Sequence, residues 1–149
     1  MRIEDAIQQK HFRNEHLRSM VNLLYSHSWL EERLKKFFKQ QHVTMQQYNI
    51  LRILRGSGMP LSTMQIRERM LDRMSDTSRI IDRMLLKNIV VKRPNETDKR
   101  LVDITITQKG LAVLEELDRV NDKMDAIAGN LTAEEAKMLN DLLDKLRGG

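Results

Sequence analysis

The chain has 149 residues, of which 40% are hydrophobic and 32% are charged, and this length suits a single domain with a real core. Because the chain contains no cysteine, disulfides, thiolate nucleophiles and cysteine-ligated metal sites are excluded. Its formal net charge is +5, no apolar run is long enough to span a bilayer, and the first residues lack the apolar stretch of a signal peptide, so we expect a cytoplasmic protein.

The first predicted element is a long helix over residues 15–41. At a rise of 1.5 Å per residue it would be about 40 Å long, which is more than a small domain needs. An apolar stripe of that length needs a surface to cover it. The stripe recurs at three- and four-residue intervals, with one longer step, through Leu17, Met20, Leu24, Leu30, Leu34 and Phe37.

Two shorter helices follow, and each begins with a predicted capping box. In the first, Thr44 caps the helix and Gln47 reaches back to the cap. In the second, Ser62 and Gln65 repeat the same spacing, and this helix is expected to end near Leu71.

A further helix is predicted over Ser75–Asn88 after a tight turn. Ser75 is the expected N-cap, and Asn88 ends the helix at a position that favours positive φ. The side chains expected to face the core are Ile80, Ile81, Met84 and Leu85.

A β-hairpin is predicted next, from Val90–Arg93 and Leu101–Thr107. The second strand alternates apolar and polar residues, which is typical of a half-buried strand. The loop between the strands is charged and carries Asp98, Lys99 and Arg100 near its tip.

The last third of the chain is predicted to be helical. Thr107 caps a helix that ends at Gly129, and Thr132 with Glu135 forms a third capping box before the final helix. Residues 44–107 hold 12 lysines and arginines against seven acidic residues, whereas residues 108–149 hold six against nine. The basic middle therefore favours a polyanionic partner for that segment alone.

Two short helices joined by a tight turn indicate a helix-turn-helix, whose second helix can enter the major groove of DNA. Small hydroxyl groups permit close approach at its N-terminus, and arginines one turn apart can bind guanine or phosphate. The predicted DNA contacts on this helix are Ser75, Thr77, Ser78, Arg79 and Arg83. The alternative is a solvated helix face whose arginines pair with Asp76 and Asp82.

The charged hairpin tip predicts a second contact. An arginine there can reach a narrow minor groove, and a carboxylate two residues earlier can pre-orient it. We therefore expect Arg100 to bind DNA, with Asp98 orienting it and Lys99 beside it. The alternative is an ordinary solvated turn.

The stretches SRIIDRMLLKNIVVKR and DKRLVDITITQKG resemble the winged helix-turn-helix of the MarR (multiple-antibiotic-resistance regulator) family of bacterial transcription factors. The resemblance covers nearly the whole chain. It implies a mainly α fold with a small β-hairpin wing, in which residues 44–107 form the DNA-binding lobe of a single domain spanning 1–149. It also implies that Asp98 and Arg100 are the wing pair. Asn88 departs from the family, which usually has glycine there.

Residues 1–43 and 108–149 are expected to form dimerisation helices, and a two-fold homodimer would place two reading helices about 34–36 Å apart on a pseudo-palindromic operator. The family resemblance implies a repressor that a small, often aromatic anion releases from DNA. Tyr25, Trp29 and Tyr48 are candidate contacts for such an effector, although aromatic residues on helices are more often plain core.

The sequence predicts no enzyme, cofactor or metal site. Its four histidines, His11, His16, His27 and His42, lack metal-binding spacing. Two alternatives stay open at this stage. One is a winged-helix module that binds protein instead of DNA, and the other is a helical protein that binds a metal or a small molecule.

Overall fold

The computed structural model describes residues 1–149 and divides the chain into two compact units. The helical unit comprises residues 1–37 and 126–149, and the winged unit comprises residues 38–125. The winged unit is larger than the expected lobe over 44–107, because it also includes residues 38–43 and the two helices that follow the hairpin. None of the helices combines the length and the apolarity needed to cross a membrane.

The helical unit is built from α1 (Ile3–Ala6), most of α2 (Glu15–Gln40), a short 3-10 helix (Ala126–Ala128) and α8 (Ala133–Leu146). The long predicted helix is confirmed as α2, and the third predicted capping box is present at the start of α8. Large apolar side chains of α2 and α8 remain exposed: Met20, Leu23, Leu24, Leu30, Met138, Leu139, Leu142 and Leu146.

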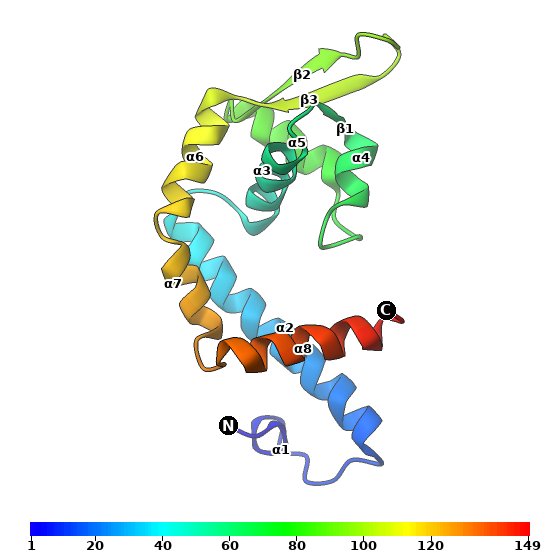
Figure 1. Cartoon of the computed structure of the whole chain (residues 1–149), viewed down its shortest axis with the longest axis vertical. Helices are drawn as coiled ribbons and strands as arrows, with labels where there is room; N and C mark the ends of the chain where they lie inside the picture. The colour runs from blue at the N-terminus through cyan, green and yellow to red at the C-terminus, as the bar shows by residue number, and fades with distance from the viewer. The chain divides into compact units, whose positions relative to one another are not determined.

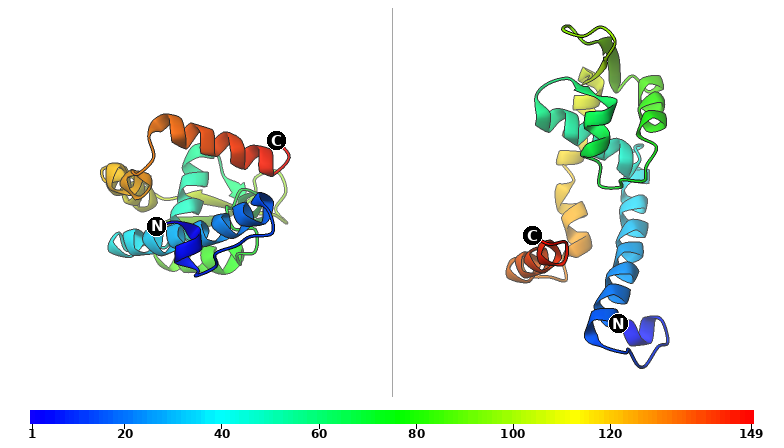
Figure 2. Two further views of the ribbon diagram at one scale, coloured as in Figure 1. Left: turned by 90° about the horizontal axis from the view of Figure 1, so that it is seen from below. Right: turned by 90° about the vertical axis from the view of Figure 1, so that its right-hand side faces the viewer.

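The winged unit has a helix-rich half and a three-stranded antiparallel sheet in the order β1-β3-β2 (Figure 1). Its elements are α3 (Met45–Ser57), β1 (Leu61–Ser62), α4 (Thr63–Glu68), α5 (Thr77–Leu86), β2 (Val90–Pro94), β3 (Val102–Ile106), α6 (Gln108–Asp118) and α7 (Asn121–Asp125). Figure 2 shows the β2–β3 hairpin extending past the helices of this unit.

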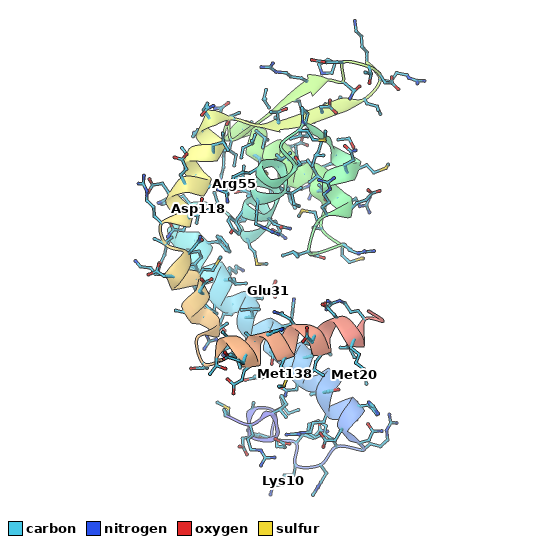
Figure 3. All side chains as sticks on the ribbon, in the orientation of Figure 1. Lys10, Met20, Glu31, Arg55, Asp118 and Met138 are labelled. Carbon is cyan, nitrogen blue, oxygen red and sulfur yellow. The ribbon has the colours of Figure 1, made fainter.

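One apolar core holds these elements together. The core takes side chains from the helices α3, α4, α5 and α6 and from the strand β3, and all of them are nearly inaccessible to solvent. These side chains are Ile50, Leu51, Leu54, Ile66, Ile81, Met84, Ile104 and Leu114. Outside the core, Arg55 of α3 and Asp118 of α6 face each other (Figure 3), with Nη1–Oδ2 and Nη2–Oδ1 distances of 2.7 and 3.3 Å. This pair raises the pKa of Arg55 and fixes α6 against α3.

Local signals in the sequence predicted most helix starts correctly. The capping boxes of α3 and α4 are present, Thr107 caps α6, and Asn88 has the predicted positive φ of 59°. The prediction of one continuous helix from Thr107 to Gly129 is wrong, because the chain forms α6, α7 and a 3-10 turn there. The two-residue strand β1 was not predicted.

Gly110 lies where the chain leaves the sheet, and a side chain there has no room. An added Cβ would lie 2.3 Å from the carbonyl oxygen of Ile89 and 2.7 Å from Cγ1 of Ile106. We predict that Gly110→Ala lowers the free energy of unfolding by about 1–3 kcal/mol or more, because backbone must move. Urea denaturation measures this change.

The matched control is Gly56→Ala in α3, where nothing lies within 4 Å of the added methyl group. That variant should be unchanged or more stable by about 0.5–1 kcal/mol, because alanine favours a helix. Equal stability of the two variants would contradict the close approach at Gly110.

Candidate nucleic-acid interface

Helix α5 has one buried face and one exposed face. Ile81 and Met84 are 1% and 0% exposed and lie in the core, which fixes the rotation of the helix about its axis. Arg79 and Arg83 fall on the opposite, exposed face, as the 3.6-residue period requires, and Ser78 is also exposed. The winged unit therefore presents both arginines of α5 to the outside.

The two arginines of α5 are only weakly engaged within the protein. The Arg79 Nε lies 3.8 Å from Oδ2 of Asp76, and both side chains are mostly exposed, so the pair is weak. Asp82 pairs at 3.5 Å with Nζ of Lys92 and not with Arg83. No acceptor in the structure lies within hydrogen-bond or ion-pair distance of the Arg83 guanidinium, which leaves its donors open to an external partner.

The start of α5 differs from the prediction. Asp76, not Ser75, is the N-cap, and its carboxylate accepts a hydrogen bond of 3.2 Å from the backbone N–H of Arg79. The Ser75 hydroxyl instead donates to the carbonyl of Asp72 at 2.7 Å. Both residue types are good caps, and here the Asp76 carboxylate is the one that accepts from the first turn of α5. Ser75 is half-buried, and Thr77 is only 3% exposed and lies apart from the open face.

The hairpin tip is an ordered loop built around Asn95. The Asn95 side-chain oxygen accepts hydrogen bonds from the backbone N–H groups of Thr97 and Asp98, at 3.0 and 2.9 Å. Its amide nitrogen donates to Asp103 at 3.0 Å, and its backbone N–H donates to the carbonyl of Leu101 at 2.9 Å. The tip is therefore held in one conformation by bonds within the hairpin.

Asp98 holds Arg100 through three hydrogen bonds. The Arg100 Nε and Nη2 donate to the two carboxylate oxygens of Asp98, each at 3.0 Å, and the Arg100 backbone N–H donates to Oδ1 at 3.1 Å. These bonds lower the pKa of Asp98 and raise that of Arg100. The Arg100 side chain is nevertheless 89% exposed, so its charge is oriented without being covered. Lys99 is exposed beside it.

The three aromatic residues considered for an effector divide between the units. Tyr25 and Trp29 belong to the helical unit, where the Arg33 guanidinium lies 3.8 Å from the centre of the Trp29 ring. Tyr48 belongs to the winged unit, where its ring packs on Phe38 at a centroid distance of 4.8 Å. The structure brings no three potential metal ligands together.

One feature near α5 was missed by the sequence reasoning. A cleft of about 520 Å³ lies between α4 and the start of α5, and its lining includes Met64, Arg67 and Met74. The i, i+3 spacing of Met64 and Arg67 placed both on one face of α4. That α5 begins opposite this face could not be predicted, because it depends on how the two helices pack.

Comparison with known proteins places these features in a family. The MarR family model matches residues 43–102. The HTH-type transcriptional regulator MgrA of Staphylococcus aureus is 30% identical over 111 residues, which cover 74% of each chain.

Two solved structures have the same fold. One is a variant of MarR from E. coli complexed with operator DNA, which is 23% identical, with a TM-score of 0.80 over 92% of this chain and 99% of that one. The other is an organohalide-sensing transcriptional regulator in its 2,4-dichlorophenol bound form, which is 19% identical, with a TM-score of 0.80 over 94% of this chain and 86% of that one.

The assignment of the α5 cap can be tested by stability. We predict that Asp76→Ala lowers the free energy of unfolding by about 1 kcal/mol, because the N–H of Arg79 loses its acceptor. Ser75→Ala should change it by less than about 0.5 kcal/mol, because Ser75 bonds only within an exposed loop. Thermal or urea denaturation compares the two variants. A larger loss of stability in Ser75→Ala than in Asp76→Ala would identify Ser75 as the cap.

Proposed function

This chain belongs to the MarR family, and from that premise we propose that it is a transcriptional regulator that binds a pseudo-palindromic operator as a homodimer. The proposed DNA contacts are Ser75, Ser78, Arg79 and Arg83 of the α5 region, with Lys99 and Arg100 at the hairpin tip. Asp98 is proposed to orient Arg100 without touching DNA itself.

A single observation carries this proposal. Two cationic elements, the exposed face of α5 and the Asp98–Arg100 tip, are fixed to the same core in one compact unit. A helix of this diameter fits a major groove, and an exposed, pre-oriented arginine suits a neighbouring minor groove. The operator-bound MarR structure supports the same mode of binding, since the two proteins share a fold.

The homodimer is supported by the surface of the helical unit. Exposed leucines and methionines along α2 and α8 form apolar faces that water solvates poorly, and a second copy of the chain would cover them. A two-fold dimer sets two α5 helices about one helical turn, 34–36 Å, apart and so favours a symmetric operator.

We further propose that the regulator is a repressor and that binding of a small aromatic or anionic molecule lowers its affinity for DNA. The dichlorophenol-bound relative of the same fold supports an effector of that class. Tyr25, Trp29 and Tyr48 remain the proposed ligand contacts. The proposal is of a cytoplasmic binding protein and not of an enzyme, in keeping with relatives that are regulators.

Selection of bound sequences from a random duplex pool tests the function. A DNA-binding dimer should enrich a two-fold symmetric site, and its affinity should fall steeply as salt rises, because bound arginines release counterions. A winged-helix module that binds an acidic protein would enrich no sequence, and that outcome would overturn the proposal.

The role of Asp98 predicts that removing a negative charge lowers the affinity for DNA, which is the opposite of the effect expected from charge alone. Asp98→Ala removes a negative charge near DNA, yet we expect it to weaken operator binding by about 0.5–1.5 kcal/mol, because Arg100 must then be ordered on binding. Fluorescence anisotropy with a labelled operator measures the change.

Glu96→Ala is the matched control, because it removes the same charge from the same loop and Glu96 has no side-chain partner in the structure. Its affinity should be unchanged or higher. If Asp98→Ala also binds as tightly as the wild-type protein, Asp98 does not orient Arg100 for DNA.

The arginines of α5 should carry sequence preference. If Arg83 or Arg79 reads a base, its replacement by alanine should weaken operator binding by about 1–3 kcal/mol and relax the preference at one position in each half-site. Repeating the pool selection with each variant measures this. A uniform loss across all sequences would make the residue a phosphate contact.

A further inference from the structure

The end of α2 is anchored in the winged unit. Helix α2 is continuous from Glu15 to Gln40, but only its last turn, from Phe38 onward, belongs to the winged unit. Phe38 is 2% exposed, and its ring packs on Tyr48 of α3. Val43, which follows the helix, is 7% exposed. Burial of these side chains fixes the last turn of α2 against α3.

The turn between α2 and α3 has an unfavourable backbone conformation. His42 has a φ of 60°, in the left-handed region that residues with a Cβ seldom adopt. Its backbone N–H donates to the carbonyl of Lys39 at 3.4 Å, which is a long hydrogen bond. A conformation of this kind persists only where other contacts hold it in place. The carbonyl group of His42 makes such a contact with a residue from another helix.

Lys87 supplies that contact from the end of α5. It is the C-cap of α5, and its Nζ donates to the carbonyl oxygen of His42 at 3.1 Å and to Oε1 of Gln47 at 2.9 Å. Gln47 is 4% exposed, and the same oxygen accepts the backbone N–H of Thr44 at 3.2 Å in the capping box of α3. One ammonium group therefore ties the C-terminal end of α5 to the turn after α2 and to the first turn of α3.

This tie joins elements that the chain itself does not connect directly. Lys87 is 45 residues from His42 and 40 residues from Gln47 in the sequence. Hydrogen bonds from a charged donor are stronger than those between neutral groups. A second lysine bonded to α5, Lys92, lies 3.5 Å from Asp82 and connects the helix to β2. Of these two lysines, only Lys87 links α5 to the end of α2.

We propose that Lys87 is a positioning residue that holds α5 in a fixed place relative to the end of α2, and that it thereby sets the spacing between the two α5 helices of a dimer. This inference rests on the proposed DNA-binding homodimer and names a residue that selects half-site spacing without touching DNA. One added base pair moves a half-site by about 3.4 Å and rotates it around the duplex axis. A dimer with firmly held α5 helices discriminates against that change, whereas a dimer with loosened helices tolerates it.

The experiment compares operators that differ only in half-site spacing. The selected operator is used as found and with one base pair added to or removed from its centre, and affinity is measured for the wild-type protein, Lys87→Met and Lys92→Met. Methionine keeps a long unbranched side chain and removes the ammonium group. Lys92→Met is the matched control, because it removes the same charge from a residue that is bonded to α5 but not to the end of α2.

A changed spacing should weaken the wild-type protein roughly tenfold or more, because the DNA or the dimer must deform to keep both contacts. In Lys87→Met this penalty should be roughly three- to tenfold smaller, which is the effect of one hydrogen bond on an equilibrium. Lys92→Met should keep the wild-type penalty. Equal penalties in all three proteins, or a salt slope that Lys87→Met lowers by about 1 for each protomer, would overturn the inference. Failure of the wild-type protein to bind any duplex would instead overturn the proposed function.

Two conservative variants separate this bond from a general loss of stability. Lys87→Arg keeps a cationic donor. Gln47→Glu keeps the acceptor of the capping box and turns the neutral acceptor of Lys87 into a carboxylate. Both variants should discriminate between spacings within about twofold of the wild-type protein, or better. If both lose the discrimination as fully as Lys87→Met, the bond between Lys87 and Gln47 is not what holds α5, and the inference fails.

A measurement without DNA tests the same tie. The chain has no cysteine, so Ser78→Cys, at an exposed position of α5 with no side-chain hydrogen bond, accepts one spin label in each protomer. Pulsed electron spin resonance then measures the distribution of distances between the two α5 helices of the free dimer. The distribution should be narrow for Ser78→Cys alone, broader when Lys87→Met is added and unchanged when Lys92→Met is added. Equal widths in the three proteins would contradict the inference, whereas labels that detect no second copy would overturn the proposed homodimer.

Discussion

The burial of one side of α5 is the constraint on which the rest of the winged unit depends. Ile81 and Met84 lie in a core that also takes in α3, α4, β3 and α6. Because a helix has a fixed period, burying these two side chains also determines which side chains face outward. The exposed arginines of α5 are thus set by hydrophobic packing, and no contact of their own is needed to aim them.

The hairpin tip is tied to the same core by the sheet. Ile104 of β3 is fully buried and pairs with Leu61 of β1 on one side and Lys92 of β2 on the other. Beyond this strand, the hydrogen bond from the Asp98 backbone N–H to Asn95 and the bond from Arg100 to Asp98 hold the exposed Arg100 side chain in place. Helix and tip are therefore held in one rigid frame, which lowers the entropy lost when both contact DNA.

What the sequence could predict was local. Capping boxes such as Thr44 with Gln47 depend on residues three apart, and they were found where the structure has them. The prediction of Ser75 as the cap of α5 was wrong, since Asp76 beside it caps helices equally well and only the fold decides between them. Strand β1 was not predicted, because its two residues form a strand only through their pairing with β3. The cleft beside Arg67 likewise exists only where α4 and α5 meet.

The central claim is that two copies of this rigid frame bind one duplex together. Hydroxyl-radical footprinting of a selected operator, with the mass of the complex measured on the same sample, tests it most directly. The account predicts two protomers per duplex and two equivalent sets of protected sugars, centred about 34–36 Å apart and related by two-fold symmetry. A single protomer on the duplex, or one unsymmetrical footprint, would contradict it.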